Sequence, residues 1–91
     1  MTAEPPDTLD GARVLLWCRV PENAQGVRAA AICRYDGASG GLYLFYCDER
    51  WRVISDWSER DADDLKDTVR QHFGVVPDAW AVREENDVPE T

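Results

Sequence analysis

The sequence predicts an α+β fold, an antiparallel sheet with one α-helix packed across one face. Three observations predict it: four apolar runs of strand length are separated by turn-forming residues, one later stretch is amphipathic at helical spacing, and no apolar run is long enough for anything but a strand or a short helix. We expect a four-stranded meander, with a possible fifth short strand, in a single domain because 91 residues supply only one core.

The first two predicted strands are Arg13–Val20 and Val27–Tyr35. Alternation in the first strand puts one set of apolar residues on a common face: Val14, Leu16, Cys18 and Val20. The second strand contains three alanines, which favour a helix, so a helix that starts after Pro21 is the alternative. We favour a strand because the segment lies between two glycine-containing turns and includes Ile32 and other residues of high β-propensity.

The third and fourth predicted strands are Leu42–Cys47 and Trp51–Asp56. The third is apolar on both faces, which is typical of a central strand or of one whose second face is covered by another subunit. The turn at Asp48–Arg50 lacks Asn-Gly, so we expect a loop longer than a tight primed turn.

The predicted helix is Asp61–Phe73. Either Ser58 or Asp61 can serve as its N-cap, and Gly74 follows as the residue at which a helix ends. Its apolar stripe consists of Ala62, Leu65, Val69 and His72/Phe73. After the helix, the possible fifth strand is Ala79–Val82.

The net charge of −8 is concentrated at the two ends. We therefore expect an acidic disordered leader over residues 1–11, a folded domain over 12–82 and an acidic disordered tail over 83–91. An acidic chain without a basic patch makes double-stranded nucleic acid an unlikely partner. The lack of a long apolar run predicts a cytoplasmic protein that has no membrane partner.

The three cysteines, Cys18, Cys33 and Cys47, lie within apolar runs, and none belongs to a CxxC motif. The only histidine is His72, so the sequence lacks a convincing set of metal ligands or a nucleophile–base pair. We interpret the thiols as structural. No cofactor, metal or catalytic residue is predicted, and we expect a protein that is not an enzyme.

The aromatic residues exceed what one short helix can cover. The leading hypothesis is a small protein-binding or accessory module that forms a homodimer through an uncovered aromatic and arginine-bearing sheet face, because Trp, Tyr and Arg are the residues of interface hot spots. The candidate interface residues are Trp17, Tyr43, Phe45, Trp51, Arg52 and Trp57.

Two alternatives remain open. The chain is an inhibitor or immunity-type protein if the acidic start of the helix binds a basic partner. The residues of that acidic patch are Asp61, Asp63, Asp64 and Asp67. In the other alternative, a small molecule binds in a pocket between helix and sheet. The residues expected to converge there are Tyr46, Cys47, Trp51 and His72.

The stretch from Leu42 to Trp80 resembles a group of small uncharacterised bacterial α+β proteins. Their pattern has a Y-L-F strand, a D-x-x-W turn, an S-D-x-W exit and a short acidic helix that ends in glycine; at the exit, this chain reads Ser55-Asp56-Trp57 without an intervening residue. The resemblance implies a compact sheet with one packed helix, and it implies no catalytic residues.

Overall fold

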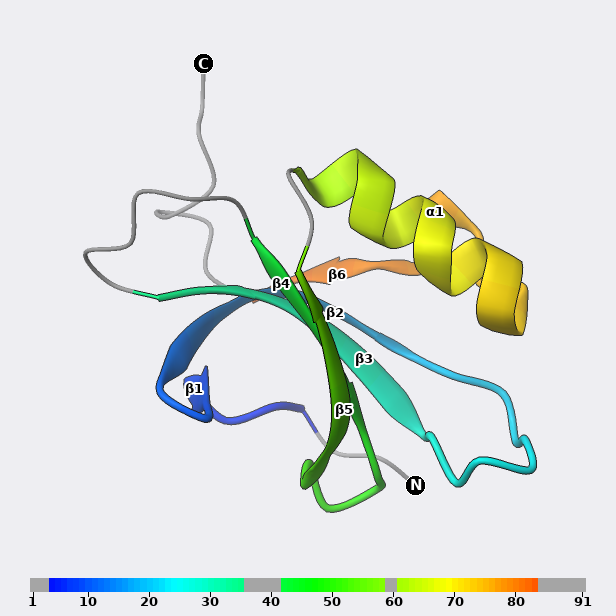
Figure 1. The fold of residues 1–91 in the computed structure, drawn as a ribbon, viewed down its shortest axis with the longest axis horizontal. Coiled ribbons are helices and arrows are strands. Elements are labelled where there is room, and N and C mark those ends of the chain that lie inside the picture. Colours follow the sequence, from blue (N-terminus) through cyan, green and yellow to red (C-terminus); the bar gives the residue numbers. More distant parts are fainter. Residues whose placement is uncertain (1–3, 36–41, 59–60, 84–91) are drawn as a thin grey trace.

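We describe residues 4–35, 42–58 and 61–83 of a computed structural model of the chain (Figure 1). They form a curled antiparallel sheet with one α-helix, which confirms the predicted α+β class. The elements in chain order are β1 Thr8–Leu9, β2 Ala12–Arg19, β3 Ala29–Arg34, β4 Tyr43–Cys47, β5 Val53–Ser58, α1 Ala62–Phe73, the 3-10 turn η1 Pro77–Ala79 and β6 Ala81–Val82. In this part of the chain, no helix has the length and apolar character needed to cross a membrane.

The four strands of the predicted meander are present, in the order β2–β3–β4–β5. The helical alternative for the alanine-rich segment is wrong, because that segment forms β3. Its alanines lie opposite bulky partners, with Ala30 paired to Tyr46 and Ala31 paired to both Phe45 and Trp17. Small side chains in β3 therefore make room for large ones on the neighbouring strands.

Both short strands, β1 and β6, pair with β2 along the edge that faces away from β3. Leu9 lies opposite Ala12 near the start of β2, and Val82 lies opposite Leu16 further along it. The possible fifth strand at Ala79–Val82 is thus present in shortened form as β6, while Ala79 belongs to η1.

A β-bulge between Val14 and Leu16 interrupts β2. Val14 belongs to the same buried cluster as Trp17, whereas Leu16 packs with Cys18 on the other side of the sheet. The predicted common face is therefore wrong at Val14, because the extra residue of a bulge resets the alternation of side chains.

Apolar side chains are buried on both sides of the sheet. The cluster on the side of α1 consists of Cys18, Val20, Val27, Ala30, Ile32, Leu44, Tyr46, Leu65, Val69 and Val75. The cluster on the opposite side consists of Leu9, Ala12, Val14, Trp17, Ala29, Ala31, Cys33, Phe45, Cys47 and Trp51. Figure 1 shows α1 on one side of the curled sheet and the segment that contains β1 on the other.

The two ends of α1 are those that the sequence predicts. Asp61 is the N-cap, and its side chain accepts a hydrogen bond of 2.9 Å from the backbone N–H of Asp64. Gly74 adopts a left-handed conformation with φ of 75°, and its N–H donates to the carbonyl oxygen of Arg70 at 2.8 Å. A residue with a side chain would be strained at this φ, so glycine ends the helix.

Residues 4–11, which fall within the predicted disordered leader, lie against the sheet on the side opposite α1. Pro5 and Leu9 are buried, and the N–H of Val14 donates to the carbonyl oxygen of Asp7 at 2.9 Å. The apolar second face of the sheet gives these residues a surface on which to be buried, and this long-range effect outweighs local composition. Residues 1–3 and 84–91, where the rest of the predicted leader and most of the predicted tail fall, lie outside the described residues.

Candidate functional site

The structure buries most of the predicted aromatic interface inside the chain itself. Phe45 is 1% exposed, Trp17 and Trp51 are each 9% exposed, and Tyr43 is half-buried. Arg52 and Trp57 are the two members of the predicted set that remain exposed. The sheet face that we expected to be open to a partner is therefore covered by the N-terminal segment and by the turn between β4 and β5.

The turn between β4 and β5 holds the side chain of Trp51 inward, and it does so with an unfavourable backbone conformation at this residue. Trp51 has a φ of 63°, a left-handed conformation that is unfavourable for a residue with a bulky side chain. Asp48 fixes the turn, since its Oδ1 accepts hydrogen bonds from the N–H groups of Arg50 at 2.8 Å and Arg52 at 2.9 Å. These backbone bonds, first the one from Arg52, lower the pKa of the Asp48 carboxyl. The indole of Trp51 then packs edge-on against that of Trp17, with 5.9 Å between ring centroids.

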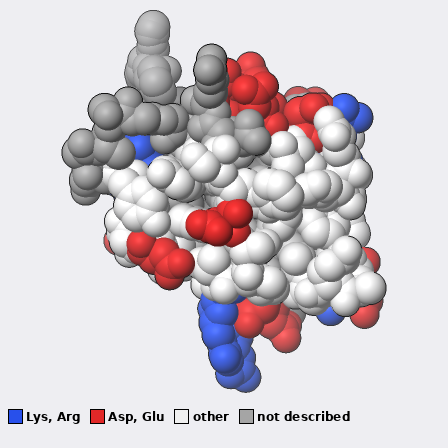
Figure 2. Space-filling model, in the orientation of Figure 1, with Lys and Arg blue, Asp and Glu red and all other residues white. Residues whose placement is uncertain are grey.

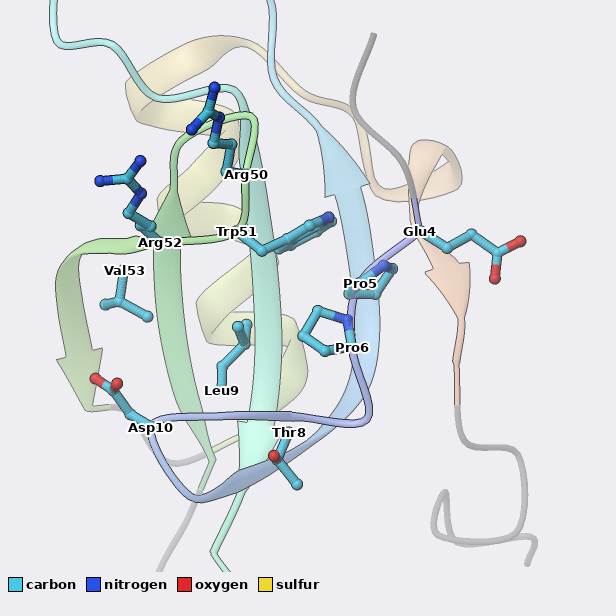
Figure 3. A pocket seen from close by; sticks show the side chains of 10 residues that line it. All are labelled: Glu4, Pro5, Pro6, Thr8, Leu9, Asp10, Arg50, Trp51, Arg52 and Val53. Carbon is cyan, nitrogen blue, oxygen red and sulfur yellow. The ribbon is translucent and has the colours of Figure 1, made fainter.

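A hollow of about 690 Å³ separates this turn from the N-terminal segment (Figure 3). Trp51 points across it toward Pro5, and Leu9 lies beneath the indole. Arg50 and Arg52 lie on the turn side of the hollow, and acidic residues, among them Asp10, lie along the N-terminal segment. Because its charges are mixed, the hollow shows no preference for a cationic or an anionic ligand.

The more distinctive surface is the free edge of β5. This strand ends the sheet order, and no described strand pairs with its outer side. Every residue from Ile54 to Ser58 is exposed, and two of them are large apolar residues: Ile54 is 47% exposed and Trp57 is 41% exposed. A second bulge, opposite Tyr46 and Cys47, makes Ile54 an extra residue in the ladder.

The backbone direction along β5 follows from the pairing of β4. The N–H of Arg28 donates to the carbonyl oxygen of Cys47 at 2.8 Å, so the backbone groups of Cys47 point toward β3. In an antiparallel ladder this direction alternates, so those of Phe45 and Tyr43 also point toward β3. Their partners on β5 are Asp56 and Ser58. The N–H and C=O groups of Asp56 and Ser58 are therefore directed outward at the free edge.

A groove of about 320 Å³ lies beside this edge on the side of α1. It is lined by Gln25, Val27, Tyr46, Ile54, Ser55, Trp57, His72 and Phe73, a set without Asp, Glu, Lys or Arg. Figure 2 shows a broad uncharged surface over the centre and right of this view, interrupted by a few acidic side chains. The groove is therefore suited to apolar side chains or uncharged polar groups.

The aromatic rings of the groove form one contiguous set. The hydroxyl of Tyr46 lies 2.7 Å from Nδ1 of His72. The ring of Trp57 is 5.2 Å from that of His72 and 6.3 Å from that of Tyr46, measured between centroids. Burial raises the pKa of Tyr46 to about 12, so its hydroxyl keeps its proton near neutral pH, and whether it donates to Nδ1 of His72 or accepts from it depends on the tautomer of the imidazole.

The predicted small-molecule pocket is assembled only in part. Tyr46 and His72 meet in the groove, whereas Cys47 and Trp51 belong to the cluster on the opposite side of the sheet. The alternation of side chains along the third predicted strand already places Tyr46 and Cys47 on opposite faces of the sheet. No sequence pattern indicated that β5 would contribute to the groove, because that contribution depends on which strand lies at the edge of the sheet.

The acidic patch has local structural roles. Asp61 caps α1, and Asp67 accepts hydrogen bonds from Arg70 at 2.6 Å and from Gln71 at 2.6 Å. The bond from Arg70 is the main reason that the pKa of Asp67 is lowered. Asp63 and Asp64 lie in the first turn, where the helix dipole favours negative charge.

The three thiols are all buried and unbridged. Burial raises the pKa of Cys18 and of Cys47 to about 12, and it also raises that of Cys33. These thiols are therefore protonated near neutral pH, which is the state in which they are poor nucleophiles. Within the described residues, no three His, Cys, Asp or Glu side chains lie together as a metal site would require.

Comparison of the chain with protein-family models, curated proteins and solved structures finds no match. The candidate site consequently depends on the geometry of β5 and the groove alone.

Proposed function

We propose that this chain is a non-enzymatic protein-binding module that takes an extended segment of another polypeptide onto the free edge of β5. The observation that carries the proposal is the exposed edge itself, where Asp56 and Ser58 direct backbone groups outward beside the exposed side chains of Ile54 and Trp57. In this proposal α1 packs across the adjoining sheet face, and its C-terminal end forms the far wall of the groove.

Strand addition suits this edge for physical reasons. A segment that pairs with β5 satisfies the outward N–H and C=O groups, which supplies affinity without regard to sequence. Side chains that point toward α1 then contact Trp57 and the uncharged groove, which supplies selectivity for apolar residues. Edge strands are normally protected, and β5 carries only a bulge and the charge of Asp56, so the half-exposed Trp57 beside outward backbone groups supports a docking role for the edge.

Selection of random peptides on the immobilised protein tests the proposal. We expect the selected peptides to bind Asp56→Pro at least about tenfold more weakly, because proline removes an outward N–H without removing a bond to β4. Asp56→Ala is the matched control, since it loses the same charge but keeps the N–H. Equal binding to the wild type and to Asp56→Pro, or the recovery of no binding peptide, would overturn the proposal.

Ser58→Pro provides a second variant should Asp56→Pro fold poorly. It removes the other outward N–H of the edge, and the same loss of binding is expected. Circular dichroism and thermal melting of each variant show whether the sheet is intact before binding is compared.

A further inference from the structure

We infer that the segment bound at the β5 edge carries a Lys or Arg side chain that lies across Ser58 toward Tyr43 and Asp56, on the sheet face away from α1. This inference rests on the proposed function, because it uses the same edge, and it adds the chemistry of the partner. Its basis is a group of carboxylates and partly exposed aromatic rings at the end of β5 that is remote from the β4–β5 turn.

The pairing of β4 with β5 places the relevant side chains on one face of the sheet. Tyr43 lies opposite Ser58, and Phe45 lies opposite Asp56. All four share the face of Phe45, which belongs to the cluster away from α1. Ser58 is small, and adjacent strands are about 4.8 Å apart. A long side chain that lies opposite Ser58 on an added strand can therefore extend across it to the ring of Tyr43.

Two tyrosines supply the aromatic part of this site. Tyr35 and Tyr43 pack edge to face, with 5.0 Å between ring centroids and 82° between ring planes. Both side chains are only partly buried, so ring surface remains open to a partner. Aromatic faces attract ammonium and guanidinium groups, and they also pack on the apolar stems of Lys and Arg. The pair is therefore suited to either basic side chain.

Two exposed carboxylates supply the negative charge. Asp10 and Asp56 both lie near the phenol of Tyr35: burial is the main reason that the pKa of Tyr35 is raised, and the charges of Asp10 and Asp56 raise it further. Within the described part of the chain, no basic side chain forms an ion pair with either carboxylate. A cation from a partner can therefore approach them without displacing an ion pair between described residues.

The described basic side chains around the site lie elsewhere. Arg50 and Arg52 belong to the turn that precedes β5 (Figure 3), and Arg52 forms an ion pair within that turn. Arg13 and Arg34 lie opposite each other, and alternation from the buried cluster puts them on the side of α1. On the face away from α1, the described charges along β5 are thus positive near the turn and negative near Ser58.

The two faces of the edge together define an alternating partner. A residue opposite Ser58 directs its side chain to the face with Tyr43 and Asp56, whereas a residue opposite Trp57 directs its side chain to the uncharged groove beside α1. The segment that fits both faces has a basic residue next to an apolar one. The net charge of −8 on the chain also favours encounter with a cationic segment.

Selection from a biased peptide library tests the inference. In this library Ile alternates with positions that are Lys, Arg, Gln or Glu, and the whole chain is immobilised. At one of the varied positions we expect Lys and Arg to be recovered about two- to fivefold more often than Gln, which is the effect of a cross-strand pair of opposite charges. Glu is expected to be depleted below Gln at the same position, since like charges repel.

Charge variants locate the selected cation. Asp56→Lys is expected to reverse the preference, so that Glu is recovered more often than Lys, a gain that a folding defect cannot produce. Asp56→Asn and Tyr43→Leu should each lower the recovery of Lys and Arg toward that of Gln, while Tyr43→Phe keeps the ring and should keep the preference. Glu49→Gln removes one negative charge from the exposed turn at the other end of β5 and is the matched control, with no change expected.

The failures of the two proposals are distinguishable. Equal recovery of Lys, Gln and Glu by the wild type, or an unchanged preference for Lys on Asp56→Lys, would overturn the cation site. If peptides without a charge preference bind the wild type and lose binding to Asp56→Pro, the proposed function stands without this site. If no peptide is recovered, or if the peptides bind Asp56→Pro as tightly as the wild type, both proposals fall.

Discussion

The two edges of the sheet are treated differently by the rest of the chain. At the β2 edge, Leu9 pairs opposite Ala12, and the N–H of Arg83 donates to the carbonyl oxygen of Leu15 at 2.7 Å. Segments from before and after the central meander are thus both used to cover one strand. At the β5 edge no described segment does the same. Among the described residues, the two edges of one sheet therefore differ in whether other segments of the chain cover them.

The open edge nevertheless has two of the features that discourage indiscriminate pairing. A bulge interrupts β5 at Ile54, and Asp56 puts a charge in the middle of its outer edge. These features leave Ser55 to Ser58 as the regular outer edge of the strand. The β2 edge is covered by hydrogen-bonded segments, whereas the described protection of the β5 edge consists of a bulge and a charge.

The largest effect on the free energy of unfolding is expected for a substitution of Trp17, on the covered strand β2. Trp17→Ala removes an indole that packs on Trp51 in the cluster beneath the N-terminal segment. We expect a loss of about 3–5 kcal/mol in the free energy of unfolding, a large part of the roughly 5–13 kcal/mol typical of a chain of this size. Urea denaturation measures it. A loss below about 1 kcal/mol would mean that the covered edge contributes little to stability.

The next effect tests whether β1 is part of the fold or an incidental contact. Leu9→Ala is expected to lower the free energy of unfolding by about 2–3 kcal/mol, because Leu9 is 5% exposed in the cluster. Thr8→Ala, at the exposed neighbouring position of the same strand, is the control and should change it by less than about 0.5 kcal/mol. Equal effects of the two variants would contradict an anchoring role for Leu9.

Alkaline pH probes the buried strands that lie between the two edges. The pKa values of Cys18, Cys47 and Tyr46 are raised to about 12 by burial. The unfolded chain releases these protons near pH 9–10, at roughly the ordinary values, while the folded chain keeps them to about pH 12. Stability is therefore full below pH 9 and falls above it, by up to about 1.4 kcal/mol per pH unit for each group. Denaturation at pH 8, 9.5 and 10.5 measures the slope, and a flat profile would contradict the burial of these groups.

The smallest effect on the free energy of unfolding is expected for a substitution on the open edge, in β5. Ile54→Thr exchanges one β-branched residue for another at a position that is 47% exposed, so the free energy of unfolding should change by only about 0.5 kcal/mol. Chemical denaturation at low protein concentration measures this change apart from any association. A loss comparable to that of Leu9→Ala would show that β5 is as integral to the core as β1, and the contrast between the edges would disappear.

Local patterns predicted most of the meander and the helix. The apolar runs placed four strands within about two residues of their positions, and the cap at Asp61 and the stop at Gly74 gave the ends of α1. Trp51 was misplaced in a strand, because its left-handed backbone is stabilised by Asp48 and by burial rather than by its own propensity. Bulges were also missed, since an apolar run carries no mark of an extra residue.

The candidate site was less accessible to sequence reasoning than the fold. The excess of apolar side chains on both faces of β4 was recognised, but its cover was sought in another subunit, whereas the chain supplies it through Pro5 and Leu9. A Pro-Pro pair in a polar, acidic segment is typical of disorder. Only the long-range contact with the sheet argues for a packed segment. Trp57 was included in the predicted interface and is exposed, although its position beside the free edge depends on the strand order.

The pairing of β6 with β2 has a consequence for the order in which a ribosome makes this protein. β2 emerges early, whereas Ala81–Val82, which pair with two of its eight residues, follow all the other described elements. Until those residues leave the exit tunnel, the nascent sheet has a partly bare strand at one side and β5 at the other. The growing chain therefore exposes more unpaired strand edge than the finished one, and a pause in translation just before Ala81 would prolong that exposure.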